Sequence, residues 1–390
     1  MKLQAVPVLI MTLAFSSADN FWGLVSPTPA AVSVFRTCYT NQQELGTCVK
    51  SSMCDMEPPK IDADTLIDYR FLPLRPRKSA NECAFLMICC PRDKIRSGPV
   101  PPTIRTTSGC GYSNLAAARF RQGTRGSNSG YADFAEFPWM VALLNNTKSN
   151  HPNAGTGPGY IGGGTLIHPS VVLTVAHKVD TFSEGDLICR AGEWDTENDN
   201  EMYTHQDRDV RQIILHEQFN KLRSHSNIAL LMLATPFVLQ PHINVACLSH
   251  TMPPPGTLCY SMGWGRDFTR GKYYASVLKK IPLPLVDPDQ CERKLRSTRL
   301  GQKYYLHHSL TCSGGVANID TCIGDGGSSL VCPTGNPADL RYAVVGLVAY
   351  GIGCGQADVP GVYAKVPELY NWISTKIAME GISDMPYVLN

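Results

Sequence analysis

The sequence predicts an all-β domain that ends in one helix and follows a small cysteine-rich module. Three observations lead to this fold class: short apolar runs, a helical apolar stripe near the carboxyl end, and a cysteine block near the amino end. From Phe134 onward, apolar runs such as 171–174, 342–348 and 361–364 alternate with turns that contain glycine or proline. Regular short strands between such turns are typical of a β-sandwich or a β-barrel.

The last predicted element is a helix from Pro367 to about Met379. Its apolar residues recur at helical spacing, which predicts a single apolar stripe that packs on the body of the domain. These residues are Leu369, Trp372, Ile373 and Ile377.

The composition is that of a globular protein with more than one module. The chain has 390 residues, of which 43% are hydrophobic and 17% are charged, and this allows a sizeable core. The formal net charge is +2, and no strong basic block stands out. Nucleic acid is therefore not an expected partner, because its phosphates need a concentrated basic surface.

The amino-terminal segment predicts secretion. Residues 1–18 begin with a basic residue, continue as an apolar run and end in Ser-Ser-Ala, which are the three regions of a signal peptide. No apolar run reaches the roughly 18 residues that a membrane span needs, so no span is expected. Residues 145–147 read NNT, which makes Asn145 a candidate N-glycosylation site on a secreted surface.

Fifteen cysteines in a secreted chain indicate disulfides, because oxidising compartments let these bonds persist. An odd count leaves at least one cysteine unpaired. Six of them form a block with the spacing C-x9-C-x5-C-x28-C-x5-CC, and the spacing alone leaves their pairing open. A module this small needs cross-links for stability, and each typically contributes about 2–4 kcal/mol.

Three short motifs in the all-β region carry the functional argument. Residues 322–330 read CIGDGGSSL, residues 174–177 read TVAH, and residues 226–230 read SNIAL. They resemble the motifs of the chymotrypsin-like serine proteases, in which the first reads GDSGGPL and the last DIALL. The resemblance covers residues 126–380 and implies two antiparallel Greek-key barrels with the active cleft between them.

The cysteine block over residues 37–91 resembles the arthropod clip domain, which also ends in two adjacent cysteines. Together the two modules are similar to the clip-domain serine protease homologues of arthropod haemolymph, such as the prophenoloxidase-activating cofactors. The resemblance implies the disulfides Cys38–Cys89, Cys48–Cys83, Cys54–Cys90, Cys110–Cys247, Cys259–Cys332, Cys291–Cys312 and Cys322–Cys354. Cys189 remains, and its apolar neighbours favour a buried free thiol over a covalent partner.

The resemblance places the catalytic triad at His177, Asn227 and Gly326. In active relatives the serine oxygen attacks the carbonyl carbon, the histidine takes its proton, and the aspartate holds the imidazole in the right tautomer. Gly326 has no side chain to attack with. An asparagine in place of the aspartate costs an active relative about 10⁴ in kcat. The chain is therefore predicted to be a non-catalytic protease homologue.

The rival interpretation is a weak trypsin-like peptidase that uses Ser328 or Ser329 as its nucleophile. Both lie past the usual nucleophile position. A shift of that size moves the oxygen by several ångströms, whereas attack needs a contact of roughly 3–3.5 Å. We therefore expect His177 to remain in an inactive cleft, hydrogen-bonded to Asn227.

The specificity pocket is expected to survive. By resemblance, Asp320 lies at its base, and Gly351 and Gly361 stand at its walls. The backbone N–H groups of Gly324 and Gly326 can form an oxyanion hole, because neither needs a side chain. We expect the cleft to dock a basic loop of a partner without cutting it, and a collapsed, unused pocket is the alternative.

Residues 92–125 are rich in Pro, Gly, Ser, Thr and Arg and lack a hydrophobic period, which predicts an exposed, cleavable linker. By resemblance the activation cleavage falls after Arg125, with Arg121 or a basic site in the clip loop as alternatives. The new amine at Gly126 is expected to reach Asp325 and to order the pocket only weakly. The family's disulfide beside the histidine is absent at both ends, where this chain has Gly162 and Lys178.

Four carboxylates in the loop 191–201 are a candidate Ca²⁺ site, because hard cations prefer oxygen ligands. They are Glu193, Asp195, Asp199 and Glu201. A solvated acidic loop is the alternative, and no cofactor is expected to be required.

The sequence thus predicts a signal peptide at 1–18, a clip domain at 37–91, a linker with the activation region at 92–125 and an inactive trypsin-like domain at 126–380. The resemblance implies a secreted cofactor or regulator of an extracellular proteolytic cascade, with innate immune melanisation in haemolymph as the expected setting. The implied partners are a clip-domain activating protease and prophenoloxidase or another cascade protein. The alternatives are an extracellular adhesion or microbial-surface recognition protein, and the weak peptidase.

Overall fold

The fold is taken from a computed structural model of the chain. It describes residues 37–40, 44–50, 53–54, 83, 87–96, 109–113, 130–146, 159–197, 201, 203–269, 271, 274–335 and 339–389. The predicted signal peptide and the candidate cleavage sites Arg121 and Arg125 lie outside these residues.

The cysteine block forms a small antiparallel sheet. Its strands β1 (Thr37–Tyr39), β2 (Leu45–Lys50) and β3 (Met87–Pro91) pair in chain order, and a 3-10 turn η4 (Arg92–Lys94) follows. Three disulfides close it, and they are the pairs that the clip resemblance implies: Cys38–Cys89, Cys48–Cys83 and Cys54–Cys90. Among the described residues of this module, the buried hydrophobic cluster comprises Val49, Cys54 and Cys90, and two of these three are half-cystines.

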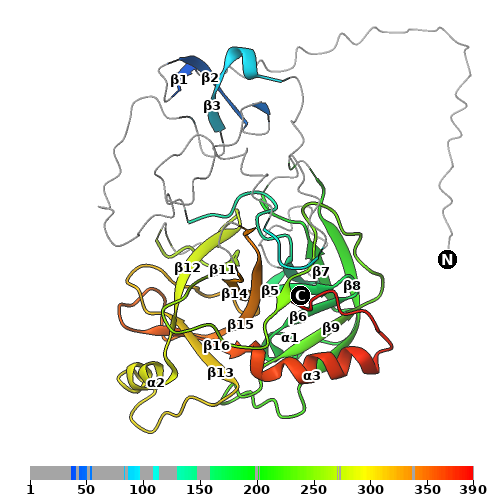
Figure 1. Cartoon of the computed structure of the whole chain (residues 1–390), viewed down its shortest axis with the longest axis vertical. Helices are drawn as coiled ribbons and strands as arrows, with labels where there is room; N and C mark the ends of the chain where they lie inside the picture. Colours follow the sequence, from blue (N-terminus) through cyan, green and yellow to red (C-terminus); the bar gives the residue numbers. More distant parts are fainter. Residues whose placement is uncertain are drawn as a thin grey trace, which may run out of the picture. The chain divides into compact units, whose positions relative to one another are not determined.

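The first half of the larger body is a closed six-stranded antiparallel barrel with the strand order β4-β5-β6-β9-β8-β7 (Figure 1). Its strands are β4 (Met140–Asn145), β5 (Tyr160–His168), β6 (Val171–Thr174), β7 (Leu187–Ala191), β8 (Gln206–Leu215) and β9 (Ala229–Leu233). All of β6 and β9 is buried. Apolar runs without alternation therefore mark the strands that line the barrel interior.

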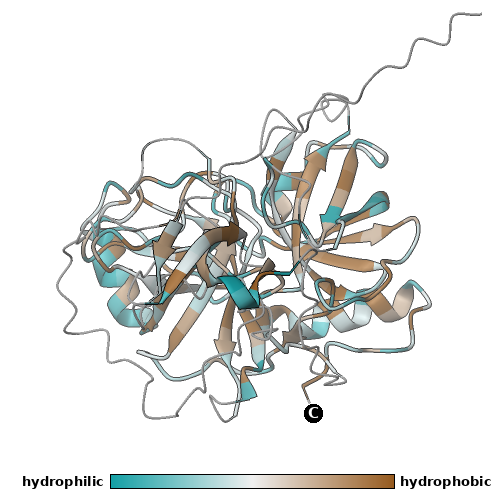
Figure 2. Ribbon diagram, turned by 90° about the horizontal axis from the view of Figure 1, so that it is seen from above, coloured by the Kyte–Doolittle hydropathy of each residue, from teal (hydrophilic) through white to brown (hydrophobic). Residues whose placement is uncertain are grey.

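The second half is also a barrel. It contains β11 (Leu258–Gly263), β12 (Lys279–Val286), β13 (Leu310–Gly314), β14 (Ser329–Pro333), β15 (Tyr342–Tyr350) and β16 (Pro360–Lys365), and pairing of β15 with β16 closes the ring. The two-residue β10 (Cys247–Leu248) adds to β15 in parallel. Figure 2 shows hydrophobic residues concentrated on the strands of both barrels. This is the double barrel that the family resemblance implies.

Within the described residues, three α-helices accompany the barrels. α1 (Ala176–Val179) follows β6, α2 (Pro288–Arg296) follows β12, and α3 (Val366–Met379) ends the fold. α3 buries Val366, Leu369, Tyr370, Ile373 and Ile377. Trp372, the remaining residue of the predicted stripe, is half-buried against the same core, and its indole N–H donates to Glu217 at 2.8 Å.

Four more disulfides tie the larger body together. They join Cys110 to Cys247, Cys259 to Cys332, Cys291 to Cys312, and Cys322 to Cys354, which are again the pairs implied by the resemblance. Cys189 on β7 is a buried free thiol. Burial raises its pKa far above the ordinary value, so the thiol stays protonated and acts as an apolar core group.

Candidate functional site

The three triad positions meet where the barrels face each other. His177 comes from α1, Asn227 from the turn before β9, and Gly326 from the turn before β14. A Cβ atom placed on Gly326 would lie 3.6 Å from Nε2 of His177. The imidazole thus still faces the nucleophile position, and the missing group is the hydroxyl.

Asn227 holds His177 in the wrong tautomer for catalysis. Its Oδ1 accepts the backbone N–H of His177 at 3.0 Å, and this leaves Nδ2 within 2.8 Å of the imidazole Nδ1. Because an amide nitrogen only donates, Nδ1 accepts the bond, and the neutral ring carries its proton on Nε2. Burial, helped by the charge of Lys178, lowers the pKa of His177. The cleft therefore meets an N–H donor and not a general base.

Lys178 crosses the place where the serine side chain would stand. Its Cε lies 2.6 Å, and its Nζ 3.5 Å, from the position of a Cβ on Gly326. The ammonium group donates to the carbonyl of Ile161 at 2.9 Å, and the alkyl chain passes beside Gly162. Burial lowers the pKa of Lys178. Where the family has a disulfide, this chain has a half-buried cation that reaches into the former catalytic centre.

Ser328 and Ser329 are both fully buried. The Ser328 hydroxyl packs against Gly163 and Gly263, and the Ser329 hydroxyl donates to the sulfur of Met262 at 3.3 Å. Neither oxygen faces the cleft, so neither can replace the missing nucleophile.

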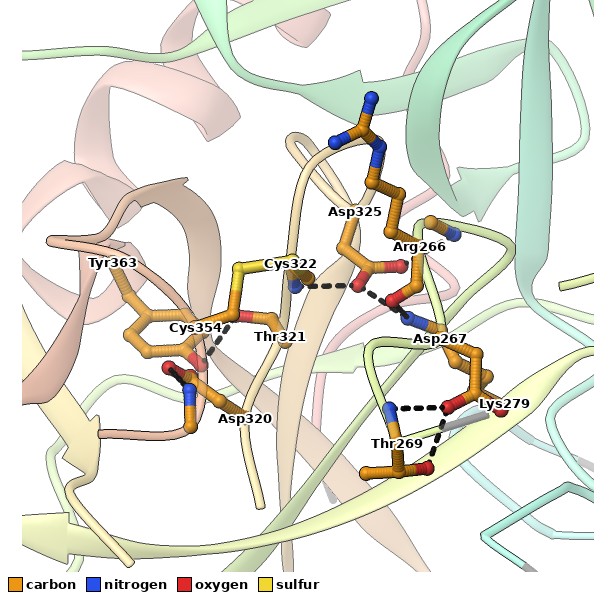
Figure 3. Close-up of a disulfide and its surroundings, with 12 residues drawn as sticks. Arg266, Asp267, Thr269, Lys279, Asp320, Thr321, Cys322, Asp325, Cys354 and Tyr363 are labelled. Atoms are coloured by element: carbon orange, nitrogen blue, oxygen red, sulfur yellow. Dashed lines mark hydrogen bonds and ion pairs between the residues drawn. A yellow bond between two sulfur atoms is a disulfide. The ribbon is translucent and has the colours of Figure 1, made fainter. Parts of the chain in front are cut away.

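Asp325 is the buried anchor of the loop that carries the site (Figure 3). It is 0% exposed, and its carboxylate accepts the N–H groups of Gly265 and Cys322, both at 2.8 Å. Lys279 completes the set with an ion pair at 2.7 Å. A lysine of the same chain thus already neutralises Asp325. The expectation that a new amino terminus at Gly126 would order this region only weakly stays a prediction, because Gly126 lies outside the described residues.

Asp320 lies on the same loop with one unsatisfied oxygen. Its Oδ2 accepts the N–H of Gly355 at 3.0 Å, whereas its buried Oδ1 has no hydrogen-bond partner among the described residues. A Cβ on Gly361 would lie 3.5 Å from Oδ1, so Gly361 packs directly beside this buried oxygen. Thr321 and Tyr363 form the neighbouring wall through a hydroxyl contact of 3.3 Å (Figure 3). A guanidinium or ammonium group is the chemical complement of this oxygen.

The remaining predicted residues of the cleft are glycines, which contribute only backbone groups. Gly351 is exposed, and a Cβ there would lie 3.2 Å from the carbonyl of Gly353. The N–H groups of Gly324 and Gly326 take part in no hydrogen bond within the described part of the chain. They remain available to an acceptor that enters the centre.

A small amidine such as benzamidine is expected to bind at neutral pH and to weaken as the pH falls through about 6. Burial raises the pKa of Asp320 to about 6, so the carboxylate that attracts the cation is lost below that pH. Calorimetric titration at several pH values measures the effect. Asp320→Asn should lose both the affinity and its pH dependence, and a wild-type affinity that is constant between about pH 5 and 7.5 would contradict the assignment.

The acidic loop does not assemble as a calcium site in the described residues. Glu193 contacts Arg190 at 3.5 Å and His205 at 3.4 Å, and Glu201 accepts the N–H of Asp195 at 3.0 Å. These three carboxylates do not gather within 4.8 Å of one another, and Asp199 lies outside the described residues. The described carboxylates bind protein groups, and Glu193 and Asp195 are buried, so the solvated-loop alternative does not describe them either.

Asn145 ends β4 and is half-buried, and its backbone N–H donates to Gly159 at 2.7 Å. Its glycosylation stays a prediction, because the threonine of the acceptor pattern is outside the described residues. No helix among the described residues is long and apolar enough to cross a membrane.

Two facing barrels, seven disulfides and a His–Asn–Gly centre define a protein with the architecture of a serine protease and with asparagine and glycine at two of the three triad positions. The trypsin family model matches residues 128–373. The chain belongs to the trypsin family and, within it, to the clip-domain serine protease homologues.

The relatives carry names consistent with an inactive centre. Phenoloxidase-activating factor 2 of Galleria mellonella is 45% identical over 303 residues, which are 76% of this chain and 98% of that protein. Two Anopheles gambiae proteins, the inactive CLIP domain-containing serine proteases A8 and A28, are 36% and 35% identical over 76% and 77% of this chain. They are matched over 79% of their own lengths. The seven disulfides fit an extracellular protein.

Proposed function

We propose that this protein is a secreted, non-catalytic cofactor of an extracellular proteolytic cascade. The proposal rests on two features that occur together. The catalytic centre lacks its nucleophile, and the loop of the specificity pocket is held in place by an ion pair. Gly326 supplies no nucleophile, while Asp325 and Lys279 hold the pocket loop in place and Asp320 presents a free oxygen. A cleft of this kind can hold a partner without cutting it.

The cascade that we propose is innate immune melanisation in haemolymph. Support comes from the Galleria relative, which is named a phenoloxidase-activating factor. The partners would be a clip-domain activating protease and prophenoloxidase or another cascade protein. We propose the domain limits 1–18, 37–91, 92–125 and 126–380 for this activity, with a cut at Arg121 or Arg125. The Cys110–Cys247 disulfide would keep the clip module joined to the barrels after such a cut.

The test reconstitutes the purified protein with an activating protease and prophenoloxidase. The wild-type chain should raise phenoloxidase activity while it neither hydrolyses an arginine chromogenic substrate nor reacts with a serine-directed phosphonate. Asp320→Asn should weaken partner binding by about tenfold or more, since it removes one member of a buried charge pair. The control is Asp384→Asn, a carboxylate beyond α3 whose side chain is 75% exposed. Wild-type protein that fails to stimulate, or Asp320→Asn protein that stimulates equally, would refute the proposal.

A further inference from the structure

The former catalytic centre has become rich in hydrogen-bond donors. The ammonium of Lys178, the Nε2–H of His177 and the free N–H groups of Gly324 and Gly326 line it. Asn227 has replaced the family's carboxylate, which removes a negative charge. Lys178 has replaced a half-cystine, which adds a positive charge. A centre that handles a neutral carbonyl in active relatives now favours an anion.

Lys178 lacks a counter-charge. Its ammonium group bonds to a neutral carbonyl, that of Ile161, and makes no salt bridge within the described residues. The side chain is only half-buried, so a ligand can reach it. A carboxylate beside it would form a charge-assisted hydrogen bond in a partly desolvated site, which is among the strong polar contacts of proteins.

Asp320 presents the opposite charge from the same loop. Residues 320–326 carry both the pocket carboxylate and Gly326, and Asp325 fixes the loop through Cys322 and Lys279 (Figure 3). The cleft therefore offers a buried acceptor in its pocket and a cation with several donors at its centre. The two groups complement a ligand that has a basic side chain and a carboxylate on the same residue.

We propose that this cleft binds the free carboxyl terminus of a polypeptide that ends in arginine or lysine. The basic side chain of that last residue pairs with Asp320. Its terminal carboxylate lies against Lys178 and the N–H donors of the former catalytic centre. An uncut loop would place only a neutral peptide carbonyl beside Lys178. The residue that follows the basic residue in that loop would also have to pass the Lys178 side chain. The site thus prefers chains that a trypsin-like protease has already cut. This inference rests on the proposed function, since it assigns a ligand class to the same non-cutting cleft.

The test compares two fluorescent hexapeptides that end in arginine, one with a free carboxylate and one with a terminal amide. Fluorescence anisotropy with the full wild-type chain should show about tenfold or more tighter binding of the free acid. Lys178→Gln, which keeps a donor for Ile161 and loses the charge, should bind both peptides alike. Asp320→Asn should weaken both peptides by a similar factor.

Two variants control for structural damage. Lys178→Arg keeps the charge and should keep the preference for the acid. Lys294→Gln alters a lysine that pairs with the exposed Asp358 and should behave as wild type. Equal binding of acid and amide by the wild type, no binding of either, or a preference that survives in Lys178→Gln would overturn the inference. If the protein stimulates the cascade but does not prefer the free-acid peptide, only this inference is contradicted. If it prefers the free-acid peptide but does not stimulate the cascade, only the cofactor role is contradicted.

Discussion

Replacing Lys279 with methionine is expected to lower the free energy of unfolding by about 3–5 kcal/mol. The change keeps an unbranched side chain that is one atom shorter and removes the charge. Asp325 is 0% exposed, so without Lys279 its carboxylate would be a buried charge with only the N–H groups of Gly265 and Cys322 to stabilise it. Denaturant unfolding of the purified variant measures the loss.

The double variant Lys279→Met/Asp325→Asn is the informative control. It removes both charges and should recover most of the lost stability, because an amide can still accept one of the backbone N–H bonds. Lys294→Met removes a half-buried lysine whose only ion-pair partner among the described residues is the exposed Asp358, and it should change stability by no more than about 0.5 kcal/mol. A Lys279→Met protein within about 1 kcal/mol of wild type would show that the ion pair does not hold the loop.

The Lys279–Asp325 pair also bears on regulation. The family resemblance implies that a new amino terminus reaches this aspartate after cleavage. Here the cation that neutralises Asp325 comes from β12 of the same chain. The pocket loop is therefore anchored before any cut is made. Asp325 is thus paired with a cation that does not depend on a new amino terminus.

The sequence motifs identified the fold and the degenerate triad because those features are local. A glycine in CIGDGGSSL and an asparagine in SNIAL can be read directly. The strand pattern alone could not separate a sandwich from a barrel, because closure depends on the non-local pairing of β15 with β16. The disulfide pairing came from the family resemblance, since spacing leaves many pairings open.

The contacts of the two lysines in the site, Lys178 and Lys279, could not be predicted from the sequence. Lys178 could be seen at the position of an absent half-cystine, but its reach across Gly326 depends on the approach of two barrels. Lys279 is the first residue of a strand whose buried side chains alternate with half-buried ones. Nothing local distinguishes it from Lys280, which pairs with Glu136 instead. Long side chains find their partners through tertiary structure, and a pattern of neighbouring residues does not encode that choice.

Restoring the triad with Asn227→Asp and Gly326→Ser is expected to give a poor peptidase, and adding Lys178→Ala should raise its kcat/KM by about tenfold or more. A serine at 326 would place its Cβ 2.6 Å from Cε of Lys178, so the two side chains compete for one position. The charge of Lys178 also lowers the pKa of His177. That effect opposes the imidazolium that forms when histidine takes the serine proton. Initial rates with an arginine ester measure the gain.

The matched control adds Lys294→Ala to the restored pair and should leave its activity unchanged. Labelling by a serine-directed phosphonate separates the two causes, because it reports whether the serine is accessible and activated. If steric competition dominates, the triple variant should label faster over the whole pH range. If the charge of Lys178 dominates, the advantage of the triple variant should be largest above the restored histidine's pKa and should shrink below it. Removal of a neighbouring cation makes the neutral imidazole a stronger base, but it also raises the pKa below which the imidazole is protonated and cannot take the serine proton. Equal rates for the double and triple variants would show that Lys178 leaves the centre freely when a serine occupies it.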